Sequence, residues 1–170
     1  MPFEVVTADV AELESLSPHH LTPAELALEN ARRKAQAVAT SHKGHWVLGA
    51  DTVVALGGQL FGKPASQDEA KAFLQALSGE THEVITACVL VEPSGVRHEF
   101  HDATEVTFRA LTPEIISRYI AEVHVLDKAG AYALQERGDW IVERVEGSRT
   151  NVIGLPTGLL AKYFMEAGLL

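Results

Sequence analysis

Stretches rich in β-forming residues predict β-strands in this sequence. The first covers residues 46–56, and two further runs lie at 83–91 and 96–108. The turn residues Pro93-Ser94-Gly95 join the last two runs, and Gly57-Gly58 is a two-residue hairpin signal after the first. We therefore expect long antiparallel hairpins rather than a purely parallel sheet.

Helical patterns alternate with these runs. Thr22-Pro23-Ala24-Glu25 forms a capping box with proline in the first turn, and an apolar stripe follows to about Thr40. Ser66-Gln67-Asp68-Glu69 is a second capping box, which opens a helix that Gly79 ends. The other expected elements are a helix from Thr112, a helix from Pro156 to near Ala167, and short strands at 3–6 and 140–145. This alternation predicts an α/β fold.

Composition and charge narrow the class of protein. The 170 residues suffice for a single domain over 1–170 with a buried core. The formal net charge of −9 argues against a non-specific nucleic-acid binder, because such a protein needs a basic face. Cys88 is the only cysteine, so no internal disulfide can form and a reducing compartment is expected. No apolar stretch reaches the ~20 residues that span a bilayer, so we expect a cytoplasmic protein without membrane partners.

The stretch GADTVVALGGQLFGKP, residues 49–64, contains the main candidate chemistry. Asp51 follows an apolar run and is expected on the C-terminal side of its strand, where ligands collect in open α/β sheets. A carboxylate there can hold a metal or act as a general base, whereas a structural aspartate that accepts turn hydrogen bonds is the alternative. Lys63 ends an incomplete phosphate-loop pattern, because Pro64 stands where Ser or Thr is required. Lys63 can still meet phosphate as a point charge.

Six segments in chain order carry a resemblance to a known family. They are Gly49-Ala50-Asp51-Thr52-Val53-Val54, Gly62-Lys63-Pro64, Leu77-Ser78-Gly79-x-Thr81-His82-x-Val84, Thr104-x-Val106-x-Phe108, Asp127-Lys128-Ala129-Gly130-Ala131-Tyr132-x-Leu134-Gln135 and Gly147-Ser148-x-x-Asn151-Val152-x-Gly154-Leu155-Pro156. Over nearly its whole length the chain therefore resembles the Maf family of nucleotide pyrophosphatases.

The resemblance implies a cytosolic enzyme, usually a homodimer, that hydrolyses a nucleoside triphosphate to the monophosphate and pyrophosphate with a divalent metal, Mg²⁺ or Mn²⁺. It also implies an elongated mixed sheet of the Maf and ITPase kind with a central cleft for the nucleotide. In family terms, Asp51 matches the proton acceptor that activates water. Lys34 and Lys63 match lysines on the phosphate side, and Glu12 matches an acidic position that holds the metal together with Asp51.

The resemblance also indicates a substrate class. Thr52 directly after the aspartate and Gln135 after Tyr132 are similar to the branch of the family that acts on dTTP and UTP. A hydroxyl and an amide can hydrogen-bond the edge of a pyrimidine ring, so the chemistry fits. A threonine that merely suits a strand and a glutamine that lies on the surface are the alternatives.

The sequence departs from the family pattern at its start. The family begins with a strand and a Ser-x-Ser-Pro-Arg-Arg loop, whereas Met1-Pro2-Phe3-Glu4-Val5-Val6 aligns with the family's second strand. Ser17-Pro18-His19-His20 is not expected to replace that loop, because it has no arginine. We expect either a start assigned too late or a shortened homologue, and we favour the first. The alternative function is a catalytically impaired nucleotide-binding regulator linked to septum formation.

Overall fold

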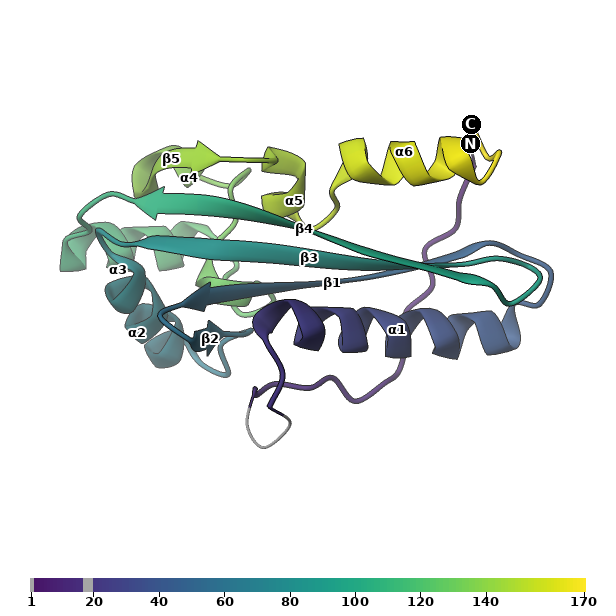
Figure 1. The fold of residues 1–170 in the computed structure, drawn as a ribbon. Coiled ribbons are helices and arrows are strands. Elements are labelled where there is room, and N and C mark those ends of the chain that lie inside the picture. The colour runs from purple at the N-terminus through teal and green to yellow at the C-terminus, as the bar shows by residue number, and fades with distance from the viewer. Residues whose placement is uncertain (1, 17–19) are drawn as a thin grey trace.

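In the part of the chain that the structure describes, five strands form one sheet in the order β2-β1-β3-β4-β5 (Figure 1). The computed structural model describes residues 2–16 and 20–170. The strands are β1 (Val47–Leu56), β2 (Gln59–Phe61), β3 (Thr81–Val91), β4 (Arg97–Phe108) and β5 (Val142–Glu146). The helices are α1 (Pro23–Ser41), α2 (Gln67–Leu77), α3 (Pro113–Glu122), the 3-10 turn η1 (Ala129–Ala131), α4 (Gly138–Ile141), α5 (Arg149–Ile153) and α6 (Thr157–Glu166). None of these described helices is long and apolar enough to cross a membrane.

The α/β class, the long hairpins and the flanking helices are confirmed. β3 pairs with β1 on one side and with β4 on the other, and β3 and β4 run the length of the molecule in Figure 1. We had expected a mixed sheet, and this was wrong: every pairing among the described strands is antiparallel. Tight turns cause this at two places, since a turn as short as Gly57-Gly58 can only reverse the chain. Both glycines have positive φ, as such a turn requires.

Helix α1 covers one face of the sheet and lies very close to β1. The predicted capping box is present, with Thr22 and Glu25 bonding reciprocally at its start. A Cβ on Gly49 would lie 2.5 Å from the carbonyl oxygen of Ala31 and 2.8 Å from the Cβ of Ala35. Only glycine therefore permits this approach, which brings side chains of α1 within bonding distance of β1.

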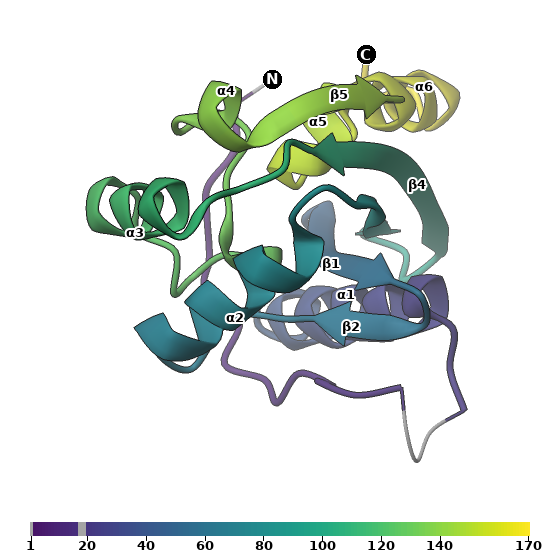
Figure 2. The same cartoon turned by 90° about the vertical axis from the view of Figure 1, so that its left-hand side faces the viewer.

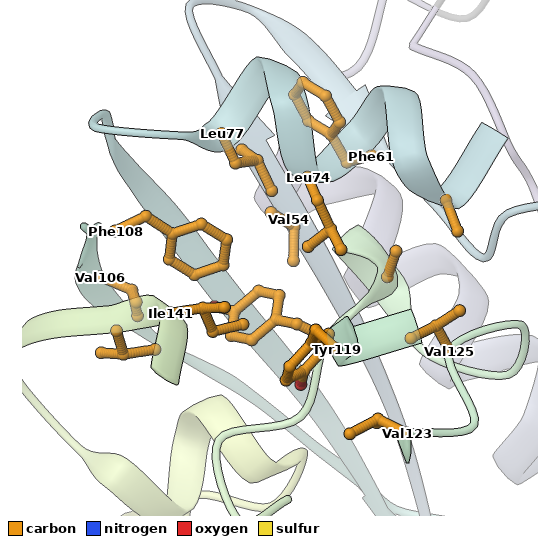
Figure 3. Close-up of a cluster of buried hydrophobic side chains, with 14 of the residues drawn as sticks. Val54, Phe61, Leu74, Leu77, Val106, Phe108, Tyr119, Val123, Val125 and Ile141 are labelled. Atoms are coloured by element: carbon orange, nitrogen blue, oxygen red, sulfur yellow. The ribbon is translucent and has the colours of Figure 1, made fainter. Parts of the chain in front are cut away.

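The opposite face carries the rest of the structure. At one end of the strands, α2, α3 and α4 enclose the larger core (Figures 2 and 3). Figure 3 shows Val54 of the sheet beside Leu74 of α2, with Phe108, Ile141 and Tyr119 gathered nearby. At the other end, α6 packs its apolar side on this face through a smaller cluster around Cys88, Phe100 and Leu160.

Two expected strands differ from the structure. Residues 3–6 form no strand, and Phe3 and Val5 are exposed because no described strand pairs with them. In 140–145 only Val142 onward is extended, since Trp140 and Ile141 belong to α4. That helical turn buries Ile141 in the larger core and places Trp140 beneath two arginines. The interpretation of Ser17-Pro18-His19-His20 rests on residues 17–19, which lie outside the described residues.

Candidate active site

A cavity of about 290 Å³ lies beside β1. Five of the six residues singled out in the sequence line it, namely Lys34, Asp51, Thr52, Lys63 and Gln135. They come from α1, β1, the loop after β2 and the segment between η1 and α4. The fold thus gathers side chains from widely separated parts of the chain around one space.

Asp51 lies in the middle of β1 rather than toward its C-terminal end, as the apolar run before it had suggested. It still reaches the cavity, because β2 pairs with β1 only from Val54 to Leu56. Beside Asp51, that edge of β1 has no partner among the described strands. The site therefore depends on an open strand edge, not on the strand end that an open parallel sheet would use.

Asp51, Lys34, Glu12 and Lys63 form a charged network. The Lys34 ammonium donates to Asp51 Oδ1 at 2.6 Å and lies 3.0 Å from Glu12 Oε1. Lys63 Nζ lies 3.9 Å from Glu12 Oε2 and is more than half exposed. Glu12 does not line the cavity itself but joins it through the two lysines. The structure thus brings all four predicted charged residues together.

Burial sets the protonation behaviour of this network. Burial raises the pKa of Asp51, and the charge of Glu12 adds to this, whereas Lys34 and Asn30 act in the opposite sense. Burial disfavours the charged form of Lys34, but the hydrogen bond and charge of Asp51, with those of Glu12, outweigh it and raise the Lys34 pKa. Asp51 is thus a stronger base than an exposed aspartate while Lys34 stays protonated.

Asn30 is a member of the site that the sequence analysis missed. It is buried on α1, and its Nδ2 donates both to Asp51 Oδ2 at 3.3 Å and to the carbonyl of Leu13 at 3.0 Å. Its Oδ1 accepts from the Leu13 N–H at 2.7 Å. Asn30 therefore attaches the segment that carries Glu12 to the helix that carries Lys34. An asparagine on the apolar face of α1, between Leu26 and Ala31, was the sequence signal for it.

Thr52 and Gln135 line the same cavity. Thr52 follows Asp51 in β1 and so points to the opposite face, where its Oγ1 lies 2.8 Å from Thr86 Oγ1. Gln135 is exposed in the segment after η1. The turn η1, just before that segment, is attached to the loop of Lys63, since the Gly130 N–H donates to the carbonyl of Gly62 at 3.1 Å.

Lys128 also lines the cavity. Its ammonium lies 2.9 Å from Asp127 and 3.5 Å from Glu136, and only 18% of its side chain is exposed. Three lysines, Lys34, Lys63 and Lys128, therefore face one small cavity. Such a concentration of positive charge favours an anionic ligand, even in a chain of net charge −9.

The carboxylates of Glu12 and Asp51 are suited to a divalent cation. A cationic group already lies between them in this structure, because Lys34 Nζ contacts both. Within residues 2–16 and 20–170, no cluster of three or more His, Cys, Asp or Glu is arranged to hold a metal. Mg²⁺ is commonly held by one or two carboxylates, with water and substrate phosphates as its other ligands. The two carboxylates therefore fit a cation that binds together with a phosphorylated ligand.

Fold and site together define an α/β protein with a lysine-lined cavity and a buried carboxylate at the open edge of an antiparallel sheet. The model of the Maf-like protein family matches residues 1–167, so the chain belongs to that family.

Relatives named dTTP/UTP pyrophosphatase are similar to this chain over most of its length. The Akkermansia muciniphila protein is 46% identical over 156 residues, which cover 92% of this chain and 80% of the relative. The Myxococcus xanthus protein is 46% identical over 170 residues, covering 98% of this chain and 83% of the relative. The Deinococcus radiodurans protein is 43% identical over 168 residues, covering 99% and 84%.

Proposed function

We propose that this protein is a nucleoside triphosphate pyrophosphatase that hydrolyses dTTP and UTP to the monophosphate and pyrophosphate. The observation that carries the proposal is the Asp51–Lys34–Glu12–Lys63 network at the edge of a lysine-lined cavity. The names of the relatives supply the substrates. Such an enzyme removes these nucleotides from the cellular pool.

Asp51 is the general base in this proposal. Hydrolysis of a phosphoanhydride requires a base that takes a proton from the attacking water. The Asp51 carboxylate is buried, and burial raises its pKa, which improves its affinity for that proton. Lys34 opposes this while it is paired with Asp51. When a phosphate competes for the Lys34 ammonium, Asp51 is released and becomes the stronger base.

Lys34 and Lys63 bind the phosphates. Each presents an ammonium at the cavity, and the leaving pyrophosphate carries negative charge that these cations stabilise. A divalent metal held by Glu12 and Asp51, Mg²⁺ or Mn²⁺, supplies further charge neutralisation when it is bound. Lys34 is central to both roles, because it contacts both carboxylates and lines the phosphate space.

Thr52 and Gln135 recognise the pyrimidine base of the nucleotide. They line the same cavity as the lysines, so one ligand can contact both groups. The hydroxyl of Thr52 and the amide of Gln135 supply hydrogen bonds of the kind that a pyrimidine edge accepts and donates. We further propose that the protein is cytoplasmic and forms a homodimer, and that it occupies a single domain over residues 1–170.

The alternative of a catalytically impaired nucleotide-binding regulator is less favoured. The relatives carry the name of an enzyme, and the four charged residues of the proposed mechanism lie together. A regulator needs a ligand site but gains nothing from a buried base beside a lysine. Turnover separates the two functions, because a regulator binds dTTP without releasing pyrophosphate.

The test is pyrophosphate release from dTTP and UTP in the presence of Mg²⁺ or Mn²⁺, with the parent chain and its Asp51→Asn variant. Because general base catalysis commonly contributes about 10²–10⁴-fold, we expect Asp51→Asn to lower kcat by at least about 100-fold. The exposed Asp139 in α4 offers the matched control, and Asp139→Asn should release pyrophosphate as the parent does. Equal turnover by the parent and Asp51→Asn would remove Asp51 from the mechanism.

A further inference from the structure

Thr86 lies directly opposite Thr52 in the sheet. The two residues are register partners of β3 and β1, and their hydroxyl oxygens are 2.8 Å apart. Thr86 is fully buried, whereas Thr52 lines the cavity. A hydrogen bond therefore connects a residue inside the protein to one that a ligand can touch.

Thr86 also contacts Asn151 of α5 through the same hydroxyl. Its Oγ1 lies 2.9 Å from the backbone carbonyl oxygen of Asn151 and donates to it, because a carbonyl can only accept. A threonine hydroxyl has one hydrogen, so Thr86 has none left for Thr52. The bond between the two threonines must then use the hydrogen of Thr52. Only this arrangement places a hydrogen in both oxygen–oxygen contacts.

Asn151 is held firmly enough to impose this direction. Its Oδ1 accepts from the Thr86 N–H at 3.1 Å, and its Nδ2 donates to the Val84 carbonyl and to Thr104 Oγ1, both at 2.9 Å. The side chain is completely buried. Its carbonyl oxygen therefore keeps its place against Thr86 whether or not a ligand is bound.

The free side of the Thr52 hydroxyl is open to the cavity. Gly154 lines the same cavity, and a Cβ on it would lie 3.5 Å from Thr52 Oγ1, so the glycine leaves this oxygen uncovered. Since the hydrogen of Thr52 points to Thr86, the oxygen presents only lone pairs to a ligand. Thr52 thus meets the ligand as a hydrogen-bond acceptor.

We propose that Thr86 is a positioning residue that fixes the Thr52 hydroxyl as an acceptor and thereby selects bases with a ring N–H, the imide of uracil or thymine. The inference rests on the proposed function and identifies the ring N–H as the group of the nucleobase that Thr52 recognises. Uracil and thymine carry a hydrogen on N3, whereas cytosine has a lone pair there. A lone pair facing Thr52 leaves a desolvated contact between two acceptors, which disfavours cytosine.

The test compares UTP with CTP in the parent, Thr86→Val and Thr86→Ser. Valine has nearly the shape of threonine but no hydroxyl, and it keeps the backbone N–H that bonds Asn151. With valine, the Thr52 hydrogen is free to turn toward the cavity and meet cytosine N3. We expect the ratio of kcat/KM for UTP to that for CTP to fall about tenfold in Thr86→Val. Thr86→Ser keeps the hydroxyl and should keep the ratio.

The ratio separates positioning from a merely structural role. A loosened site lowers kcat/KM for both nucleotides together, so a parallel fall in Thr86→Val would overturn the proposal. A ratio unchanged in Thr86→Val, or lost equally in Thr86→Ser, would overturn it as well.

Binding distinguishes failure of this proposal from failure of the proposed function. Calorimetric titration with UMP and CMP needs no turnover. If the parent releases no pyrophosphate but prefers UMP, and Thr86→Val narrows that preference, the enzyme function is lost and the role of Thr86 stands. Equal affinity of the parent for UMP and CMP overturns the role of Thr86, whatever the turnover.

If Thr86→Val fails to fold, the parent alone decides by titration with 3-methyl-UMP, in which a methyl group replaces the N3 hydrogen. We expect its affinity to fall at least about tenfold below that of UMP. Equal affinity would mean that the N3 hydrogen is not read, which overturns the proposal.

Discussion

Asp51 and Thr52 are neighbours in β1, yet their side chains enter two very different networks. Asp51 points to the face that α1 covers and joins Lys34 and Glu12 through charged contacts. Thr52 points to the other face and joins Thr86 and Asn151 through neutral hydrogen bonds. One strand therefore places a charged network and a neutral network on its two sides, and both reach the same cavity.

Each network contains one buried asparagine. Asn30 connects α1 to Leu13 and Asp51, and Asn151 connects α5 to β3 and β4. The partners differ in their exposure to water. Asn30 bonds the half-buried Leu13 near the surface, whereas the partners of Asn151 lie inside the sheet.

The two networks therefore respond differently to a ligand. Phosphate oxygens offer Lys34 a new partner, so the charged network can rearrange when a nucleotide binds. Every hydrogen of the Thr52–Thr86–Asn151 chain is already committed, so the neutral network keeps its geometry. Under the proposed function, the charged face performs the chemistry and the neutral face recognises the base.

The strongest disruption of the charged face is Lys34→Met. It removes the cation that contacts both Glu12 and Asp51 and so breaks the ion pair of the buried Asp51 carboxylate. We expect kcat/KM for UTP to fall by about 100-fold or more, because the variant loses both the contacts to phosphate and the contact that positions the general base Asp51. Steady-state pyrophosphate release measures this.

Lys43→Met supplies the matched control, because Lys43 is an exposed lysine just beyond the end of α1. It should leave kcat/KM at the parental value. A Lys34→Met variant within threefold of the parent would show that the charged face does not carry the chemistry.

Substitution of each buried asparagine should affect the two networks differently. Asn151→Ala leaves the Thr86 N–H, the Val84 carbonyl and Thr104 without their partner inside the sheet. We expect it to lower the free energy of unfolding by about 3 kcal/mol. Asn30→Ala should cost about 1 kcal/mol, since water can reach Leu13, but lower kcat about tenfold because Asp51 and the Glu12 segment lose their attachment.

Urea unfolding and pyrophosphate release on both variants check this crossed pattern. The comparison fails if Asn30→Ala is the more destabilised variant and Asn151→Ala the less active one. It fails equally if both variants lose stability and activity in the same proportion.

Most of the fold could be predicted from the sequence, because its local signals agree with the final structure. The capping box at Thr22 and the glycine pair at 57–58 both form as expected. Local signals failed where tertiary contacts decide. Residues 3–6 have a strand-like composition, but a strand needs a neighbour, and composition does not supply one.

The charged residues of the candidate site could be proposed only through the family resemblance. Nothing in the spacing of Glu12, Lys34 and Asp51 shows that they meet, because the close approach of α1 to Gly49 brings them together. Thr86 was missed because it resembles an ordinary residue of its strand, and Asn30 was missed because its place on the apolar face of α1 does not show which groups it bonds. The role of each residue depends on the polar groups that the fold places next to it, and the sequence alone does not show which groups these are.

Acid can charge a buried residue of the neutral face, His82. His82 lies in β3 on the same face as Thr86, is buried, and has its Nε2 2.9 Å from the hydroxyl of Tyr132, which lines the cavity. Its Nδ1 finds no hydrogen-bond partner among the described residues. Burial lowers the pKa of His82 to about 4. At the pH at which an exposed histidine begins to bind a proton, the His82 ring in the folded protein is therefore still neutral.

Mild acid should weaken this face through His82. Between the ordinary pKa of 6.5 and about 4, the unfolded chain binds a proton at this residue and the folded chain does not. His82 therefore does not reduce the free energy of unfolding well above pH 6.5. Below that pH it lowers the free energy of unfolding, by about 2 kcal/mol at pH 5. Urea unfolding at pH 7 and pH 5 should show a smaller loss in His82→Gln, which cannot titrate but can still bond Tyr132. The exposed His45 serves as control, and His45→Gln should lose as much as the parent. Equal losses in the parent and His82→Gln would mean that His82 does not make the neutral face sensitive to acid.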